Sequence, residues 1–286
     1  MKIETHFHED TFTLTYIVYD ESSKDAVVID PVLDYNPNSS SFFYDAIDKV
    51  QAFLEKESLN LKLILDTHAH ADHLSGAQEL KKRFPFAPYG IGCEITQVQE
   101  VFKGIYNLKE LKTDGSQFDL LFADGQEMQA GTLKFKVLHT PGHTPACYSY
   151  LVEDCLFTGD ALFMPDFGTG RCDFPRGSAE DLYNTVHDKL YSLPDETRVF
   201  VGHDYQPEGR ELKFETSIGE SKAQNKQLKA STSKEEFVKF RSERDAVLDA
   251  PRLLLPSIQV NIDGAKFPQP EDNGAMYLKI PFRARG

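Results

Sequence analysis

A six-residue segment, HAHADH, brings together side chains that bind divalent metal ions. It holds the imidazoles of His68, His70 and His73 and the carboxylate of Asp72. Imidazole nitrogens and carboxylate oxygens are ligands that zinc and iron take up in proteins. Because packing alone does not explain so many polar groups in six residues, the segment predicts a metal site. It could serve one ion or two adjacent ions, and the sequence leaves both alternatives open.

Three further metal-binding side chains occur later in the chain, each in a short segment that contains glycine. His143 lies in HTPGHT, Asp160 in FTGDA and His203 in VGHDY. Glycine allows the backbone to turn tightly, as loops that converge on an ion must do. One such histidine alone would be expected to have a structural role. The joint occurrence of all three with the HAHADH segment predicts a metal centre.

Each of these segments follows a stretch that is typical of a β-strand, which would place the side chains at the edge of a sheet. The strand signals are runs of β-branched, aromatic and aliphatic residues that close in Gly, Pro, Asp or His. Loops at the ends of such elements commonly carry functional residues. We predict strands, of which the first two form a hairpin, at residues 11–20, 25–31, 61–67, 133–141, 146–154, 155–160 and 197–204.

Helical signals alternate with these strands. They consist of apolar residues at three- and four-residue spacing, Ser or Thr caps and acidic first turns. Asp72 and His73 are expected on the first turn of a helix that continues through Arg83. We predict helices, of which the last two lie on the surface, at residues 41–57, 74–83, 179–193, 220–229 and 231–247.

The mixture of strands and helices favours an α/β sandwich. Neither a GxGxxG nor a GxxxxGK[ST] loop is present, which argues against a nucleotide-binding sheet. We predict a catalytic domain in residues 1–215. Residues 216–286 are predicted to form a C-terminal extension, partly helical and partly irregular, that packs on the same domain.

Composition excludes some classes of partner. The 31 basic and 45 acidic residues give a net charge of −14 with no basic block, which argues against nucleic acid or an anionic membrane surface as the main partner. No signal segment or run of about 20 apolar residues is visible, so a cytoplasmic location is expected. The four cysteines lack CxxC spacing and are expected to be reduced thiols.

The motifs also carry a family resemblance. THAHADH, HTPGHT, TGD and GHD occur in the order found in the metallo-β-lactamase superfamily, which implies a four-layered αββα sandwich with its site at one rim. HADHLSGA, HTPGHTPAC, FTGDALF, GRCDF, LYNTVHDKLYSLP and VGHDY together resemble persulfide dioxygenases, also called sulfur dioxygenases. The MPDFGTGRCDFPRG loop and the PEDNG tail are similar to the bacterial β-lactamase-hydrolase-like branch.

The resemblance implies an iron enzyme and assigns its catalytic metal ligands. One Fe(II) per chain would be held by His68, His143 and Asp160, a facial triad that leaves positions open for substrate and O2. The implied reaction takes glutathione persulfide, O2 and water to sulfite and glutathione, in a protein that forms a homodimer. Four residues would orient these ligands or hold a second metal: His70, Asp72, His73 and His203.

The alternative is a zinc-dependent thioester hydrolase similar to glyoxalase II. In that case Asp72, His73 and His203 become ligands of a second Zn(II), and Asp160 bridges the two ions. Metal content and oxygen uptake would distinguish the two enzymes. The CDFPRG loop favours the dioxygenase.

An acidic protein needs local cations to bind the two carboxylates of glutathione. Arg171 and Arg176 follow Asp160 in the same loop and are predicted substrate-binding residues, because an arginine can grip a carboxylate through two parallel hydrogen bonds. Tyr205 is a third candidate, as a hydrogen-bond donor. Cys172 is expected to be a buried thiol without a catalytic role. Three cations of the tail are expected to be surface charges: Lys279, Arg283 and Arg285.

Overall fold

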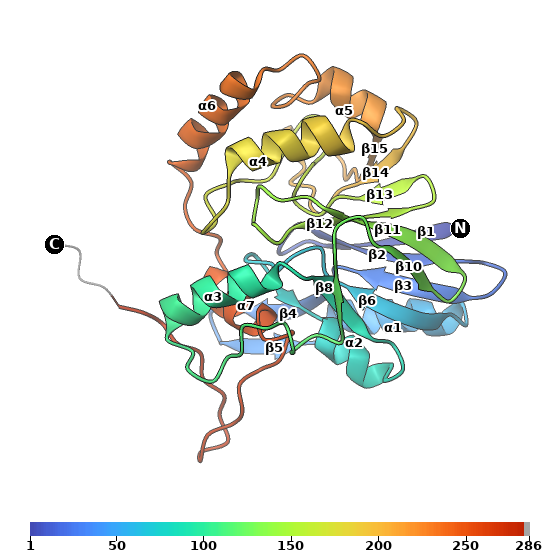
Figure 1. Ribbon diagram of the computed structural model, residues 1–286. Helices are drawn as coiled ribbons and strands as arrows, with labels where there is room; N and C mark the ends of the chain where they lie inside the picture. Colours follow the sequence, from blue (N-terminus) through green and yellow to red (C-terminus); the bar gives the residue numbers. More distant parts are fainter. Residues whose placement is uncertain (283–286) are drawn as a thin grey trace.

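Two six-stranded β-sheets pack face to face in the computed structural model of this chain, which describes residues 1–282 (Figure 1). Helices cover the outer face of each sheet, so the predicted four-layered αββα sandwich is confirmed. Arg283 and Arg285, two of the expected surface charges, lie outside the described residues. None of the helices in residues 1–282 has both the length and the apolar character needed to cross a membrane.

The first sheet has the strand order β1-β2-β3-β6-β8-β9. β2 and β3 are antiparallel, as the predicted hairpin requires, whereas β3, β6, β8 and β9 run parallel to one another. The parallel strands bring their carboxyl ends to one edge of the sheet. Their bounds are β1 Lys2–His8, β2 Thr13–Tyr19, β3 Asp25–Ile29, β6 Asn60–Leu65, β8 Tyr89–Gly92 and β9 Leu120–Phe122.

The second sheet follows the chain in simple order, β10 to β15. Its strands alternate in direction except that β13 and β14 are parallel, so β11, β13 and β14 point the same way. The carboxyl ends of these three strands therefore meet at one edge. Their bounds are β10 Glu127–Ala130, β11 Leu133–His139, β12 Tyr148–Val152, β13 Cys155–Phe157, β14 Arg198–Phe200 and β15 Glu215–Ser217.

A small third sheet corrects two of the predicted helix starts. It consists of β5 (Ser41–Phe43), β4 (Val32–Asn36) and β7 (Leu74–Ser75), in that order. Residues 41–43 pair with β4, and Leu74 and Ser75 pair with the other side of β4. Both segments were predicted to be helical, but the backbone of β4 offers them hydrogen bonds that an isolated periodicity does not reveal. The helices begin only at Asp45 and Ala77.

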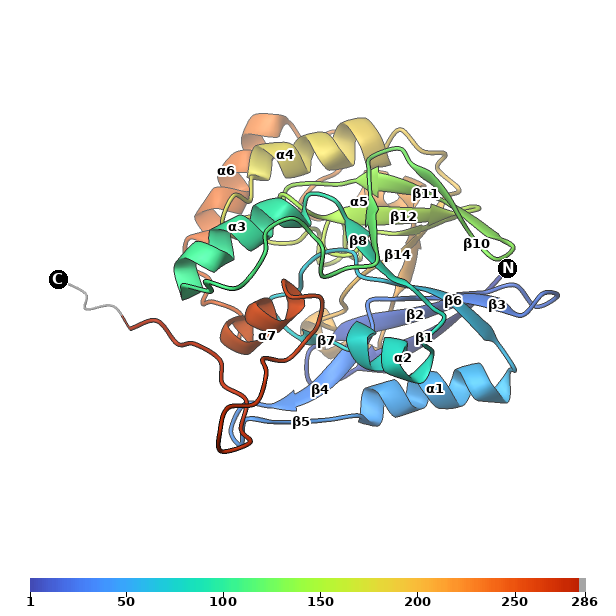
Figure 2. The ribbon, with the colours of Figure 1, turned by 60° about the horizontal axis from the view of Figure 1, so that its bottom comes forward.

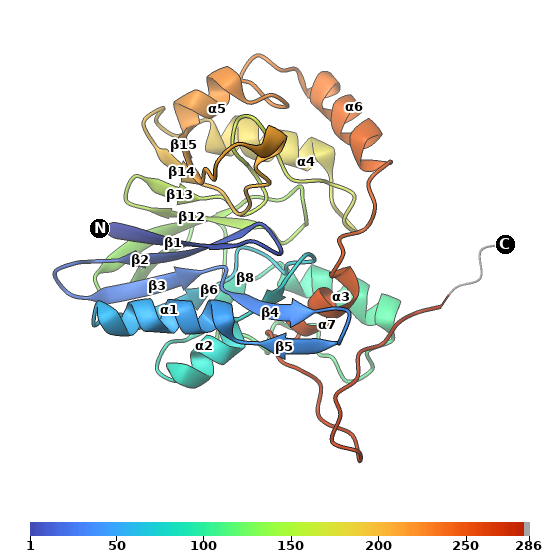
Figure 3. The same ribbon diagram turned by 180° about the vertical axis from the view of Figure 1, so that it is seen from behind.

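The helices lie on the two outer faces. Helices α1, α2 and α3 cover the first sheet, and α4, α5 and α6 cover the second (Figures 1 and 3). The α4 helix continues as a π-helical segment, Thr185–Leu190, and a short 3-10 turn occupies Pro207–Gly209. The bounds are α1 Asp45–Lys56, α2 Ala77–Arg83, α3 Ile95–Tyr106, α4 Ala179–Asn184, α5 Ile218–Gln224, α6 Lys234–Asp245 and α7 Leu254–Asn261.

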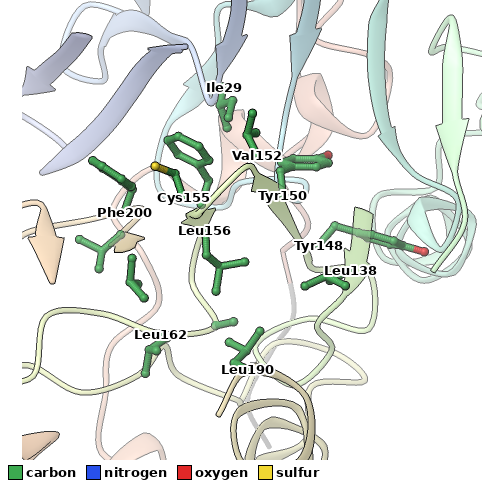
Figure 4. Close-up of a cluster of buried hydrophobic side chains, with 14 of the residues drawn as sticks. Ile29, Leu138, Tyr148, Tyr150, Val152, Cys155, Leu156, Leu162, Leu190 and Phe200 are labelled. Atoms are coloured by element: carbon green, nitrogen blue, oxygen red, sulfur yellow. The ribbon is translucent and has the colours of Figure 1, made fainter. Parts of the chain in front are cut away.

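The side-chain period of two in the strands separates two hydrophobic cores. Along β2, Tyr16 lies in the core between the sheets, whereas its neighbour Ile17 lies in the core beneath α1, α2 and α3. Figure 4 shows Ile29 of β3 among Tyr150 and Val152 of β12, in the core that joins the two sheets. A shift of one residue in the register of β2 would exchange the side chains that the two cores receive.

The C-terminal extension takes part in both cores. Phe237 of α6 is buried in the core that lies between the sheets and beneath α4, and Ile258 of α7 is buried beside α3 in the other core (Figure 2). The predicted cap of α6 is confirmed, because Ser233 and Glu236 form a capping box. The predicted helix at 220–229 ends earlier, at Gln224, because the Asn225 side chain accepts the backbone N–H groups of the next turn.

Candidate metal centre

The predicted metal-binding segments converge on the rim where strand ends of the two sheets meet. β6 of the first sheet and β11, β13 and β14 of the second each end in one of these loops. Asp72 and His73 lie in the loop between β6 and β7, and the expectation that they occupy a helical turn is wrong, because α2 starts later. The loops bring together all seven predicted side chains: His68, His70, Asp72, His73, His143, Asp160 and His203.

One group of three forms the arrangement predicted for the iron ligands. His68, His143 and Asp160 each offer a ligand atom, and these three atoms lie within 4.8 Å of one another. Nε2 of His143 is 3.6 Å from Oδ2 of Asp160. Two imidazoles and one carboxylate on one side of a cavity can hold a divalent metal and leave its other side accessible.

A second group lies on the other side of the Asp160 carboxylate. Nε2 of His203 is 3.3 Å from Oδ1 of Asp160 and 3.4 Å from Oδ2 of Asp72. Nδ1 of His73 is 3.5 Å from the Asp72 carboxylate. Asp160 therefore presents one oxygen to each group, so the geometry can accommodate either one ion or two.

Hydrogen bonds on the far side of each imidazole turn a lone pair toward the centre. Nδ1 of His143 donates to the Arg171 carbonyl at 2.6 Å, and because a carbonyl only accepts, Nε2 of a neutral ring keeps its lone pair. Nδ1 of His68 bonds the Thr67 hydroxyl at 3.0 Å in the same manner. Several buried polar atoms form no hydrogen bond within residues 1–282, as is expected of atoms that bind a metal: Nε2 of His68, His73 and His203, Nδ1 of His70, and Oδ1 of Asp160.

Burial favours the neutral form of two imidazoles in this centre, and the neutral form is the one that binds a metal cation. Burial lowers the pKa of His68 and His70 well below the usual 6.5, so both rings are neutral at pH 7 and can donate a lone pair. Burial opposes a charge on His203, but the carboxylates of Asp72 and Asp160 outweigh it and raise the pKa of that ring. A metal ion would satisfy these carboxylates in place of the proton.

Asp30, at the end of β3, is a supporting residue that the sequence analysis missed. Its Oδ1 accepts hydrogen bonds from Nε2 of His70 at 3.0 Å and from the Thr67 backbone at 2.7 Å. The ring of His70 is thereby held with Nδ1 toward the centre. Burial raises the pKa of Asp30 to about 6. Its place directly after a buried strand, in DAVVIDP, is a signal that could have found it.

Asn261 of α7 is a second missed residue, and no sequence signal indicates it. Its side-chain amide donates to the carbonyls of His70 and His73, both at 2.8 Å, and its oxygen accepts the Ser75 N–H at 2.9 Å. These three bonds hold the HAHADH loop in shape. The C-terminal extension thus supports the metal centre from behind.

Gly159, beside Asp160, shows why a glycine is needed in this rim. Its φ of +50° is in the left-handed region, and a Cβ there would lie 2.5 Å from the hydroxyl oxygen of Thr67. A side chain at this position would push apart the loops that carry His68 and Asp160. The prediction of tight glycine turns near the centre agrees with this geometry.

A cavity of about 380 Å³ opens onto the centre, with His143 and Asp160 in its wall. This volume is within the range of roughly 300–1,000 Å³ that is usual for small-molecule sites. Three aromatic rings of its wall, Phe163, Phe167 and Tyr205, pack against one another. Tyr205 also stacks on the His203 ring.

The structure places the predicted substrate-binding residues unequally. Arg171 and Tyr205 line the cavity. Arg176 does not, and its predicted place beside the substrate is wrong, because the loop turns at Arg176 (φ +65°) and its guanidinium pairs with Glu100 on α3 at 3.6 Å. Burial raises the pKa of the Cys172 thiol far above its usual range, and all four cysteines are free, in keeping with reduced thiols.

Comparison with known proteins gives the same family signal. Residues 8–203 match the family model of the Metallo-beta-lactamase superfamily. The chain is 48% identical to Glyoxylase B2 of Dictyostelium discoideum, over 98% of this chain and 96% of that protein. It is 44% identical to the Beta-lactamase hydrolase-like protein of Xylella fastidiosa (strain Temecula1), over 99% of this chain but only 65% of that protein.

Similarity to persulfide dioxygenases is lower but extends over most of the chain. The human mitochondrial persulfide dioxygenase ETHE1 is 33% identical over 82% of this chain and 78% of its own length. The crystal structure of ETHE1 from Myxococcus xanthus superposes with a TM-score of 0.75 and 32% identity, covering 93% of this chain and all of that one. The three resemblances inferred from the motifs are confirmed.

Proposed function

Because this chain belongs to the metallo-β-lactamase superfamily, we propose that it is an iron-dependent persulfide dioxygenase that converts glutathione persulfide, O2 and water to sulfite and glutathione. The observation that carries the proposal is the grouping of His68, His143 and Asp160, of which His143 and Asp160 lie in the wall of a cavity of about 380 Å³. The similarity to persulfide dioxygenases along most of the chain supports it.

The proposed ligands fit Fe(II). Two imidazoles and one carboxylate would hold a ferrous ion, which would supply redox chemistry toward O2 that zinc does not. In the overall reaction the terminal sulfur loses four electrons and O2 gains four. Glutathione persulfide, O2 and water give glutathione, sulfite and two protons, so atoms and charge balance.

The chain's own residues would position the reactants. The bond from Nδ1 of His143 to the Arg171 carbonyl, and that from His68 to Thr67, fix both rings and the direction of their lone pairs. The packed rings of Phe163, Phe167 and Tyr205 form an apolar wall on the side of the cavity next to His203. Electrostatic contacts with a bound substrate are stronger in an apolar site whose polar groups are already held in position.

A zinc-dependent hydrolase of glutathione thioesters is the second candidate. The observation that favours it is the position of Asp160, whose two oxygens face His143 and His203 at 3.6 and 3.3 Å. Such a carboxylate could bridge two ions, and two-metal sites of this kind are typical of hydrolases. The relative named Glyoxylase B2 also agrees with this candidate.

One paired assay decides between the two. The protein is purified with its native metal, metal content per chain is measured, and oxygen uptake and sulfite formation from glutathione persulfide are followed with and without air. Hydrolysis of a glutathione thioester is measured on the same sample. About one iron per chain and turnover of persulfide that stops without air support the dioxygenase. Two zinc ions per chain, thioester hydrolysis and no oxygen uptake would overturn it.

A further inference from the structure

Among residues 1–282, four arginines line the cavity that opens onto the metal centre: Arg171, Arg241, Arg244 and Arg252. The protein as a whole carries a net charge of −14, so such a cluster of cations at one site is a local exception. The question is which of these charges remain available to a ligand. An arginine whose guanidinium is already matched by a carboxylate adds little attraction for an anion.

Two of the four are matched by protein carboxylates. Arg171 forms two parallel hydrogen bonds with Asp173, both at 2.6 Å, and Arg241 forms a buried ion pair with Asp245 on the same helix. Burial and these partners fix both guanidinium groups in the wall. They shape the cavity without contributing an unpaired charge.

The other two are free. Arg244, near the end of α6, and Arg252, just before α7, are exposed to solvent and form no ion pair with any residue in the described part of the chain. The only hydrogen bond of the Arg252 side chain within residues 1–282 goes to the Asp10 carbonyl at 3.2 Å, which leaves its charge uncompensated. Both project from the C-terminal extension onto the same cavity as Asp160.

We propose that Arg244 and Arg252 bind the carboxylates of the substrate and so determine the preference for a dianionic peptide thiol derivative. This inference rests on the proposed function, because the two terminal carboxylates of glutathione are the anions that it assigns. Arginine grips a carboxylate through parallel N–H donors, and a partly enclosed cavity strengthens that contact. Two of the metal ligands, His143 and Asp160, line the same cavity as these two exposed cations.

Arg171 then acts as a positioning residue. Its Nη1 donates to the Asp249 carbonyl at 2.7 Å, in the segment that joins Arg244 to Arg252. Its own carbonyl accepts from His143, so one residue connects the metal ligand to the segment that carries the two free cations. A loss of the Arg171 side chain should release this segment while leaving the carbonyl in place.

The test measures binding and turnover separately. Arg244→Gln, Arg252→Gln and the double variant are prepared as metal-loaded protein. Binding of S-methylglutathione, which carries both carboxylates but no reactive sulfur, is measured by calorimetry. KM and kcat are measured with glutathione persulfide and with 2-hydroxyethyl persulfide, which carries no carboxylate. Arg176→Gln is the matched control, because Arg176 is also an exposed arginine and does not line the cavity.

Each single replacement should weaken S-methylglutathione binding and raise KM for glutathione persulfide by about ten- to a hundredfold, with kcat little changed. KM for the persulfide without carboxylates should not change, and Arg176→Gln should match the wild type in every measurement. Unchanged binding in the double variant, or an equal loss with the persulfide without carboxylates, would overturn the proposal. If wild-type protein binds S-methylglutathione but oxidises no persulfide, the proposed function fails while the role of the arginines stands.

Discussion

The buried ion pair between Arg241 and Asp245 should make a large contribution to the stability of the C-terminal extension. Both side chains are almost fully buried, at 3% and 5% exposure, and they sit one turn apart on α6. Asp245 also accepts the Cys172 N–H at 2.7 Å, in the loop that follows Asp160. We expect Asp245→Ala to leave a buried guanidinium with no carboxylate and a backbone N–H with no acceptor.

The size of the effect follows from burial. Removing one partner of a buried pair costs roughly 3–5 kcal/mol, because the remaining charge stays desolvated. The same helix provides a control of identical spacing, Lys239 and Glu243, whose side chains are 76% and 69% exposed and 3.9 Å apart. An exposed pair of this kind contributes only about 0.3–0.5 kcal/mol. Asp245→Ala should therefore lower the free energy of unfolding about tenfold more than Glu243→Ala.

The assay is equilibrium unfolding in urea of both variants, together with hydrogen exchange at the loop after Asp160. The loop containing Cys172 should lose protection in Asp245→Ala and not in Glu243→Ala. A double replacement, Arg241→Met with Asp245→Leu, should recover most of the loss, because it removes the stranded charge. If Asp245→Ala and Glu243→Ala differ by less than about 1 kcal/mol, the assigned role of burial is refuted.

Three further outcomes are expected at other positions. Asp160→Ala should lose its metal, with affinity reduced by more than about tenfold, and metal analysis after dialysis checks this against Asp173→Asn. Arg171→Ala should raise KM with little effect on metal content, and unchanged kinetics would contradict its positioning role. The Arg210 guanidinium lowers the pKa of Asp166 by hydrogen bonds of 2.5 and 2.9 Å. The wild type should therefore exceed Asp166→Asn in stability above about pH 4, by at most about 1 kcal/mol because Asp166 is 44% exposed, and the difference should disappear as the pH falls further.

The sequence by itself determined the metal-binding side chains and the strands that present them. HAHADH, HTPGHT, TGD and GHD are short segments, so the residues that meet at the rim lie within a turn of a recognisable strand end. The period of two in strands such as β2 likewise predicts which side chains share a face of the sheet. These are local relations, which a linear pattern records. The boundary between residues 215 and 216 remains a prediction.

The tertiary structure alone decided which residues support the metal centre and which of the predicted residues lie away from its cavity. Asn261 holds the carbonyl of His70 across 191 residues of chain, and the docking of α7 rather than any local pattern creates that contact. Arg171 and Arg176 look alike in the sequence, yet one lines the cavity and the other turns to Glu100 on α3. Hydrogen bonds and ion pairs depend on distances of a few ångströms between segments that are far apart in the chain, and only the packed fold sets those distances.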